Sequence, residues 1–466
     1  MSSQKSCSSA WKLTAALGAG LFLIGAIYGG EQGPRYLRFE EVAETIRLFD
    51  GSGMPESEIS NNTVWDAWIQ KQDKQVRARI DRGLEDSLSN WILYGTSYTS
   101  LPRLQSAEGA VTESGELSAK AGARVRALAV ALEAAPSERV RVARKLLAQN
   151  GIAKSRVVQF LSENLKRFKK EQDSYQKTLE GAAKSGDTQD VLLTRGTLYA
   201  ARGLSVDTSL LPNYAVEDTL HSLAEKGVVT ARKIRRIAVI GPGLDFADKR
   251  DGYDFYPLQT IQPFAVMEAV LRLGLGQADD LEIVTLDLNP SVNEHIAGVA
   301  KEARAGRGYT VQLPRDTNAG WNAAAVGYWK HFGEILGTRA KPLLVPQTLG
   351  GVTLLAVKIA PWYASRVSTL DLNIVAQTID FAQNQRFDLV VATNVLVYYD
   401  RLQQAIAMAS IAHMMSPGGI LIANNALPAQ HEQSLEYLGG RSVSYALEGS
   451  YGDDIVVYRR TARAQF

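Results

Sequence analysis

Short runs rich in aliphatic residues recur through the second half of the chain and show little polar alternation. A strand covered on both faces needs no such alternation, so the runs predict buried strands of a parallel sheet. Helical segments opening near Pro263 and covering Gln403–Met415 lie between them. Strands that alternate with helices indicate an α/β fold with a doubly wound, Rossmann-like sheet over residues 231–466. The runs are Ile237–Ile240, Leu281–Leu286, Ser368–Leu370, Phe387–Ala392 and Ile420–Ala423.

Two further features belong to this half of the chain. A long insertion is expected over residues 291–365, with a helix at Ala323–Leu336 and a strand at Val352–Ile359. Near the C-terminus, Ser442–Tyr445 and Ile455–Tyr458 predict an antiparallel hairpin that closes the sheet.

Residues 31–230 follow a helical period instead. Val158, Leu161, Leu165 and Phe168, for example, form one apolar stripe. Ser137 is placed as the N-cap of a helix that ends near Asn150-Gly151. The change of pattern predicts a helical accessory domain and a boundary near residue 230.

The first thirty residues have a different pattern. Leu13–Tyr28 carries no charge, and Trp11 and Gly29-Gly30 extend it to about the 17–25 residues that a spanning helix needs. An uncleaved signal-anchor and a cleaved signal peptide are both open readings, and a buried core helix is the alternative. We expect residues 11–30 to attach the protein to a membrane. Lysines before the run and arginines after it leave the orientation open.

Composition narrows the function classes. The chain has 466 residues, a net charge of +2, one cysteine (Cys7) and five scattered histidines. A thiolate metal site is therefore excluded, and no metal is expected. Between Lys120 and Glu171 there are 13 Lys or Arg and 4 Glu. Acidic lipid or RNA could bind there, but the aromatic residues of this stretch lie on its apolar stripe, so solvated helix faces are preferred and nucleic acid is not expected.

Candidate binding residues stand where the predicted strands end. Gly241 and Gly243 would let a carboxylate or phosphate approach backbone N–H groups. Asp287 is placed to accept hydrogen bonds from ribose hydroxyls, or else forms a turn before Asn289-Pro290. Asp371 would read an adenine amino group, or is an exposed strand-end acid. Asn394 would reach the cleft, or caps a helix.

Tyr398 and Tyr399 follow Asn394 closely. They are candidates to line a substrate pocket or to pack beneath the next helix, and packing is favoured for one of the two. We select Tyr398, together with Asn394, as the candidate catalytic pair.

Rival nucleotide sites fit the sequence less well. A dinucleotide site requires G-x-G-x-x-G and an acid about 20 residues later, yet Phe246 takes the third small position and Asp287 lies farther downstream. No G-x-x-x-x-G-K-[ST] loop is present, and no serine elbow follows a strand.

Five segments resemble the class I S-adenosylmethionine-dependent methyltransferases. The stretch Phe387–Tyr399 is similar to the fourth motif of the chemotaxis receptor methyltransferases, with Asn-Val-Leu followed by aromatic residues. Two features depart from the family pattern: the acidic, aromatic loop Asp245–Tyr256 and the long insertion. The segments are Val239–Gly243, Val284–Pro290, Leu370–Leu372, Phe387–Tyr399 and Met415–Asn424.

The resemblance implies a seven-stranded sheet and S-adenosylmethionine as the cofactor. It implies that Gly241 and Gly243 hold the methionine end, Asp287 the ribose and Asp371 the adenine, with Asn394 near the methyl group. The expected function is a membrane-anchored methyltransferase with an unknown acceptor. An inactive binding or scaffold protein of the same fold, and another nucleotide-dependent enzyme, stay open.

Overall fold

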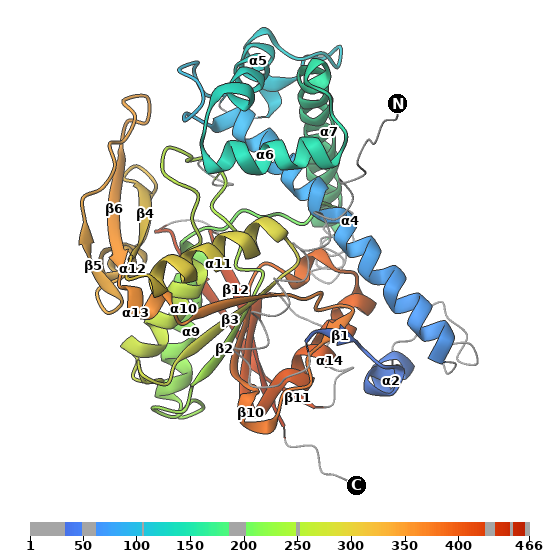
Figure 1. Cartoon of the computed structure of the whole chain (residues 1–466), viewed down its shortest axis with the longest axis vertical. Coiled ribbons are helices and arrows are strands. Elements are labelled where there is room, and N and C mark those ends of the chain that lie inside the picture. The colour runs from blue at the N-terminus through green and yellow to red at the C-terminus, as the bar shows by residue number, and fades with distance from the viewer. Residues whose placement is uncertain are drawn as a thin grey trace, which may run out of the picture.

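The structure is a computed structural model of the whole chain (Figure 1). It describes residues 33–48, 62–104, 107–185, 202–247, 252–424, 434–447 and 451–461.

A seven-stranded sheet forms the centre of the C-terminal region. Its order is β11-β12-β10-β9-β2-β3-β7, and only β12 runs against its neighbours. The predicted hairpin near the C-terminus is confirmed as β11 and β12. In chain order this reads 3-2-1-4-5-7-6, so the first five strands follow the doubly wound arrangement. The strands are β2 (Arg236–Ile240), β3 (Glu282–Asp287), β7 (Val367–Asp371), β9 (Phe387–Ala392), β10 (Met415–Asn424), β11 (Leu435–Ser444) and β12 (Gly452–Arg460).

The sheet is buried on both faces, as the aliphatic runs predicted. Alternate residues of β2 belong to two hydrophobic clusters: Ile237 and Val239 to one, Ala238 and Ile240 to the other. Side chains of α9, α10 and α11 join the first cluster, and those of α14 join the second. These helices are α9 (Leu211–Glu225), α10 (Gln262–Arg272), α11 (Pro290–Arg304) and α14 (Arg401–Met414).

The predicted insertion contains one helix of the doubly wound pattern. Asn289 caps α11 through its side chain and Pro290 occupies the first turn, so the helix starts directly after β3. The part outside the pattern therefore begins at β4. It is a three-stranded antiparallel sheet of order β4-β6-β5 with the helices α12 and α13. Its elements are β4 (Tyr309–Asp316), α12 (Ala323–His331), β5 (Gly337–Ala340), β6 (Val352–Ile359) and α13 (Pro361–Ala364).

The N-terminal region is helical, as predicted, and its longest member is the 33-residue helix α4. The caps at Ser137 and Asn150-Gly151 are confirmed. Strand β1 pairs with β8, which follows β7 in the chain. The elements are β1 (Arg35–Tyr36), α2 (Phe39–Leu48), α4 (Asn62–Tyr94), α5 (Ala119–Ala134), α6 (Glu138–Gln149), α7 (Val157–Ser185) and β8 (Gln377–Thr378).

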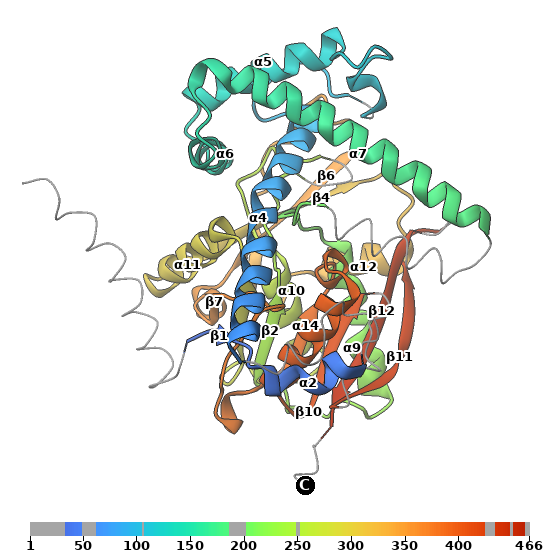
Figure 2. The same cartoon turned by 90° about the vertical axis from the view of Figure 1, so that its right-hand side faces the viewer.

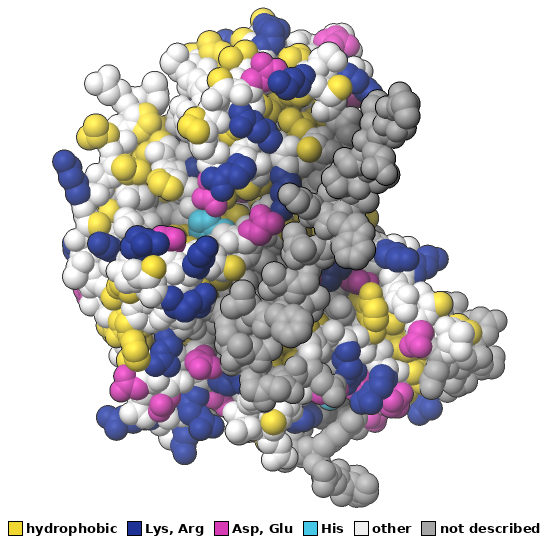
Figure 3. Space-filling view, in the orientation of Figure 1, with side chains coloured by type: hydrophobic (Ala, Val, Ile, Leu, Met, Phe, Trp, Pro, Cys, Tyr) yellow, Lys and Arg dark blue, Asp and Glu magenta, His cyan; other side chains and the backbone are white. Residues whose placement is uncertain are grey.

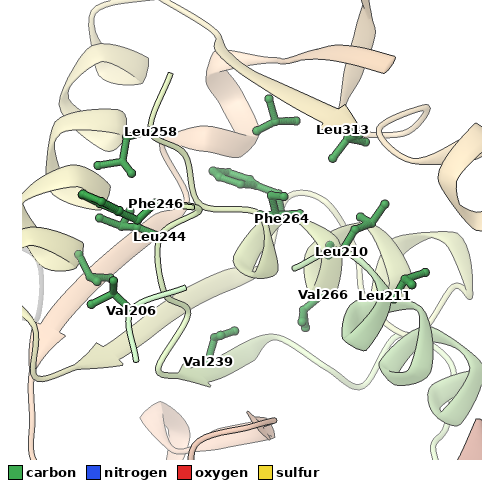
Figure 4. Close-up of a cluster of buried hydrophobic side chains, with 14 of the residues drawn as sticks. Val206, Leu210, Leu211, Val239, Leu244, Phe246, Leu258, Phe264, Val266 and Leu313 are labelled. Carbon is green, nitrogen blue, oxygen red and sulfur yellow. The ribbon is translucent and has the colours of Figure 1, made fainter. Parts of the chain in front are cut away.

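Both regions contribute to one hydrophobic cluster. Figure 4 shows part of it, with Val206 from the N-terminal region and Leu244 and Phe246 from the C-terminal region. The buried Arg139 of α6 adds hydrogen bonds to the main-chain carbonyls of Asp245 and Phe246. The helical region is thus packed onto the loop that follows β2.

None of the helices in the described residues combines the length and apolarity needed to cross a bilayer. The predicted membrane segment, residues 11–30, lies outside the described residues. On the face seen in Figure 3, Lys and Arg side chains are spread out, with Asp and Glu among them.

Candidate functional site

The loops after β2 and β9 lie at the switch point of the sheet, where strand order reverses. Ligands of open α/β sheets bind at this position. The backbone here adopts left-handed conformations, with φ of +62° at Gly241, +67° at Gly243 and +59° at Asn394. Asn394 is one of two described non-glycine residues with positive φ, a conformation that concentrates at functional sites.

The two glycines are required by the protein's own packing. A Cβ on Gly241 would lie 2.5 Å from the Val395 side chain, and one on Gly243 would lie 2.6 Å from the Val206 carbonyl oxygen. The sequence predicted these glycines as room for a ligand. Contact with a cofactor stays a prediction, and the close packing around the turn was not foreseen.

Asp287, at the end of β3, is close to the glycine turn. Its Oδ1 accepts a hydrogen bond from the Asn289 N–H at 2.7 Å, and the Gly243 N–H also stabilises the carboxylate. Burial nevertheless raises the pKa of Asp287 to about 7. Among the described residues no cation forms an ion pair with it. The site therefore holds a half-buried acceptor for which the described residues provide no counter-charge.

Asp371 is the register partner of Asp287, one strand further along the sheet. Its side chain is 51% exposed and forms an ion pair with Arg77 of α4 at 2.8 Å. The structure thus brings Asp371 to the same edge as Asp287. No motif in the sequence marks Arg77, because an arginine on a helix surface does not reveal its partner.

Asn394 is fixed through its backbone by a chain of polar groups. Its N–H donates to Asn424 Oδ1 at 2.9 Å, and Asn424 Nδ2 donates to Asp453 Oδ1 at 3.0 Å. The Tyr445 hydroxyl donates to Asp453 Oδ2, and burial raises the pKa of Asp453. The Asn394 side chain itself is exposed. Sequence reasoning missed Asp453, which precedes the core of the last strand and stands in no motif.

The two tyrosines after Asn394 have different surroundings. Tyr399 is 3% exposed, and burial raises its pKa. Tyr398 is half-buried, and its carbonyl accepts a hydrogen bond from Arg79 of α4 at 2.7 Å. Tyr399 is therefore the packing residue, and Tyr398 is left as the candidate for substrate contact.

One group of potential metal ligands occurs among the described residues: Glu41, Asp380 and His413. The guanidinium of Arg35 already lies between the two carboxylates and donates to both. Its hydrogen bond is the main reason why the pKa of Asp380 falls to about 2. The acids are thus neutralised by an internal cation.

The seven-stranded mixed sheet with helices on both faces is a doubly wound, Rossmann-like fold. No family model and no curated protein matches the chain. Among solved structures, the N-methyltransferase NodS from Bradyrhizobium japonicum WM9 is 13% identical with a TM-score of 0.27, covering 58% of this chain and 99% of that one.

Two other structures are similar at the same low level. Magnesium protoporphyrin IX methyltransferase from Synechocystis PCC 6803 is 9% identical, with a TM-score of 0.27 and coverage of 58% and 84%. MtNAS, solved with MTA and tNA, is 10% identical, with a TM-score of 0.24 and coverage of 73% and 88%. None of the three is a chemotaxis receptor methyltransferase, so that finer resemblance stays a prediction.

Proposed function

We propose that the chain is an S-adenosylmethionine-dependent methyltransferase whose site lies at the carboxyl ends of β2, β3 and β9. The observation that carries the proposal is the convergence of the Gly241–Gly243 turn and Asp287 at the switch point of a sheet of this order. A half-buried carboxylate that has no counter-cation among the described residues suits a ligand that offers hydroxyl donors and a positive charge. S-Adenosylmethionine offers both.

Each site residue has one role in this proposal. Asp287 accepts hydrogen bonds from the ribose hydroxyls, and the backbone of the Gly241–Gly243 turn packs against the methionine end. Asp371 faces the adenine. Asn394 directs its exposed side chain toward the methyl group, and Tyr398 borders the acceptor.

The reaction depends mainly on alignment. S-Adenosylmethionine supplies a methyl group already activated on a sulfonium, so correct placement of an acceptor accounts for much of the rate. A general base is needed only where the acceptor has to lose a proton. The polar chain from Asn394 to Asp453 keeps the loop after β9 in one conformation.

The first test uses the pH dependence of binding. Ribose hydroxyls favour the charged form of Asp287, so affinity should rise with pH until the carboxylate ionises near pH 7 and stay constant above it. With that pKa, calorimetry should give S-adenosylmethionine binding about tenfold weaker at pH 6 than at pH 8. Asp287→Asn should bind weakly at both values. A wild-type profile as flat as that of the variant would remove Asp287 from the site.

The same pKa shift has the opposite consequence for folding of the free protein. The carboxyl loses its proton near pH 4 when unfolded and near pH 7 when folded. The contribution of Asp287 to stability is therefore fully present below pH 4 and is lost as the pH rises to about 7. Tighter binding and lower intrinsic stability should thus accompany each other across this range.

Membrane attachment through residues 11–30 is the second part of the proposal. It is supported by the uncharged run Leu13–Tyr28 in the sequence. Full-length protein should sediment with membranes, and Leu21→Arg with Ile24→Arg should release it, because each central arginine costs about 3 kcal/mol on insertion. Wild-type protein that is wholly soluble with its N-terminus intact would contradict the anchor.

A binding or scaffold role without methyl transfer is the alternative. One observation favours it: the space beside Gly241 is taken by Val395 and that beside Gly243 by Val206. Absence of S-adenosylmethionine binding by the wild-type chain would support this alternative.

A further inference from the structure

Helix α4 passes along the carboxyl edge of the sheet (Figure 2). Arg77 contacts the end of β7, and Arg79 contacts the loop after β9. The segment 203–207, which packs on α4, covers the glycine turn through the hydrogen bond from the Leu244 N–H to the Val206 carbonyl at 2.7 Å. The N-terminal region therefore contacts the loops on both sides of the proposed cofactor site.

The guanidinium of Arg77 is held on three sides. Nη1 pairs with Asp371 Oδ1 at 2.8 Å, Nε donates to Asp73 Oδ1 at 2.9 Å, and Nη2 donates to Gln377 Oε1 at 3.3 Å. A guanidinium fixed by three acceptors holds its partner in one direction, which a flexible lysine ammonium does not.

The neighbouring Asp73 strengthens this arrangement. It is 6% exposed and accepts hydrogen bonds from the Tyr36 hydroxyl at 3.0 Å and from Asn373 Nδ2 at 2.8 Å. Asn373 stands two residues after Asp371, and its Oδ1 accepts from the Val375 N–H at 3.1 Å. Together Asp73 and Arg77 fix the loop after β7, where Asp371 is held at one oxygen while its side chain stays half exposed.

We propose that Arg77 is a positioning residue for the adenosine end of the cofactor. It orients Asp371 beside Asp287, so that the exposed carboxylate oxygen accepts a hydrogen bond from a nucleoside amino or hydroxyl group. The inference rests on the proposed function. The N-terminal helical region then forms part of the cofactor site, and α4 contributes to binding of the adenosine part of the cofactor.

A purely structural role for the ion pair is the competing explanation, and ligand fragments separate the two. The experiment titrates the full chain with S-adenosylmethionine and with 5′-methylthioadenosine, which keeps the adenosine and the methylthio group and lacks the amino-acid end. The variants are Arg77→Ala, Asp371→Asn and the double variant. Lys74→Ala is the matched control, because it removes one charge from the exposed face of the same helix.

Arg77→Ala should weaken both ligands equally, by about threefold to tenfold, as expected for coupling between contacting charged groups. Asp371→Asn should do the same, and the double variant should bind no more weakly than Asp371→Asn. Lys74→Ala should bind as wild type does. The affinity of Arg77→Lys, which keeps the charge, should lie between that of wild type and that of Arg77→Ala. This variant also serves as the test if the alanine variant does not fold.

Three results would overturn the inference. The first is that Arg77→Ala and Arg77→Lys both fold and bind as wild type does, and the second is that the losses of the single variants add in the double variant. Either result would leave the proposed function standing. A wild-type chain that binds neither ligand would remove the proposed function and this inference with it.

Discussion

Replacement of Asp287 by alanine should weaken binding of S-adenosylmethionine at least about tenfold. A hydrogen bond to a charged acceptor contributes about 1.5–3 kcal/mol, and 1.4 kcal/mol corresponds to a tenfold change in affinity. The variant without ligand should remain folded, because wild-type Asp287 is only half-buried and forms no ion pair with a cation among the described residues. Calorimetry of both proteins at pH 8 measures the effect.

Asn394→Ala is the comparison for this result. We expect it to retain most of the affinity and to lose turnover, because its role concerns the methyl group. Asn394→Gly separates the side chain from the backbone, since glycine adopts the φ of +59° freely. Equal S-adenosylmethionine affinity in wild type and in folded Asp287→Ala would exclude Asp287 from the site.

The largest loss of stability is expected for Gly83→Ala in α4. A Cβ at Gly83 would lie 1.6 Å from the Leu204 carbonyl oxygen, and a Cβ at Gly203 would lie 2.3 Å from the Gly83 nitrogen. Helix α4 and the 203–207 segment are thus in contact through their backbones. A backbone cannot move aside as the end of a flexible side chain can. Overpacking costs about 1–3 kcal/mol and more where backbone has to shift, so we expect at least about 3 kcal/mol in denaturant unfolding.

Gly122→Ala in α5 is the matched control. The nearest atom to a Cβ there is Arg126 Nη1 at 3.5 Å, so the methyl group fits. Alanine favours a helix over glycine by about 1 kcal/mol, and this variant should be as stable as wild type or more stable. If Gly83→Ala had the same midpoint of denaturant unfolding as wild type, α4 and the 203–207 segment would not pack as described.

The features that could be predicted from the sequence depend on short stretches of the chain. Buried strands are visible as aliphatic runs, and the ends of parallel strands fall on one edge of the sheet, so Gly241, Asp287 and Asn394 could be brought together from their positions alone. The cap at Ser137 and the hairpin of β11 and β12 likewise depend on short segments.

The features that the sequence did not predict depend on contacts between segments that are far apart in the chain. Arg77 and Asp371 are 294 residues apart in the sequence (371 − 77), and the residues that flank each of them do not indicate the pairing. The glycine turn shows the same limit. Positive φ was a sound reason for glycine at 241 and 243, but the side chains that exclude a Cβ there belong to Val395 and to the 203–207 segment, whose placement follows from tertiary packing.

The proposal that the chain binds S-adenosylmethionine is tested most directly by titrating the purified full-length chain with this cofactor at pH 8. NAD and ATP are titrated in parallel. We expect one saturable site for S-adenosylmethionine and no heat of binding for NAD or ATP at the same concentrations. No binding of S-adenosylmethionine, or tighter binding of either comparison nucleotide, would contradict it.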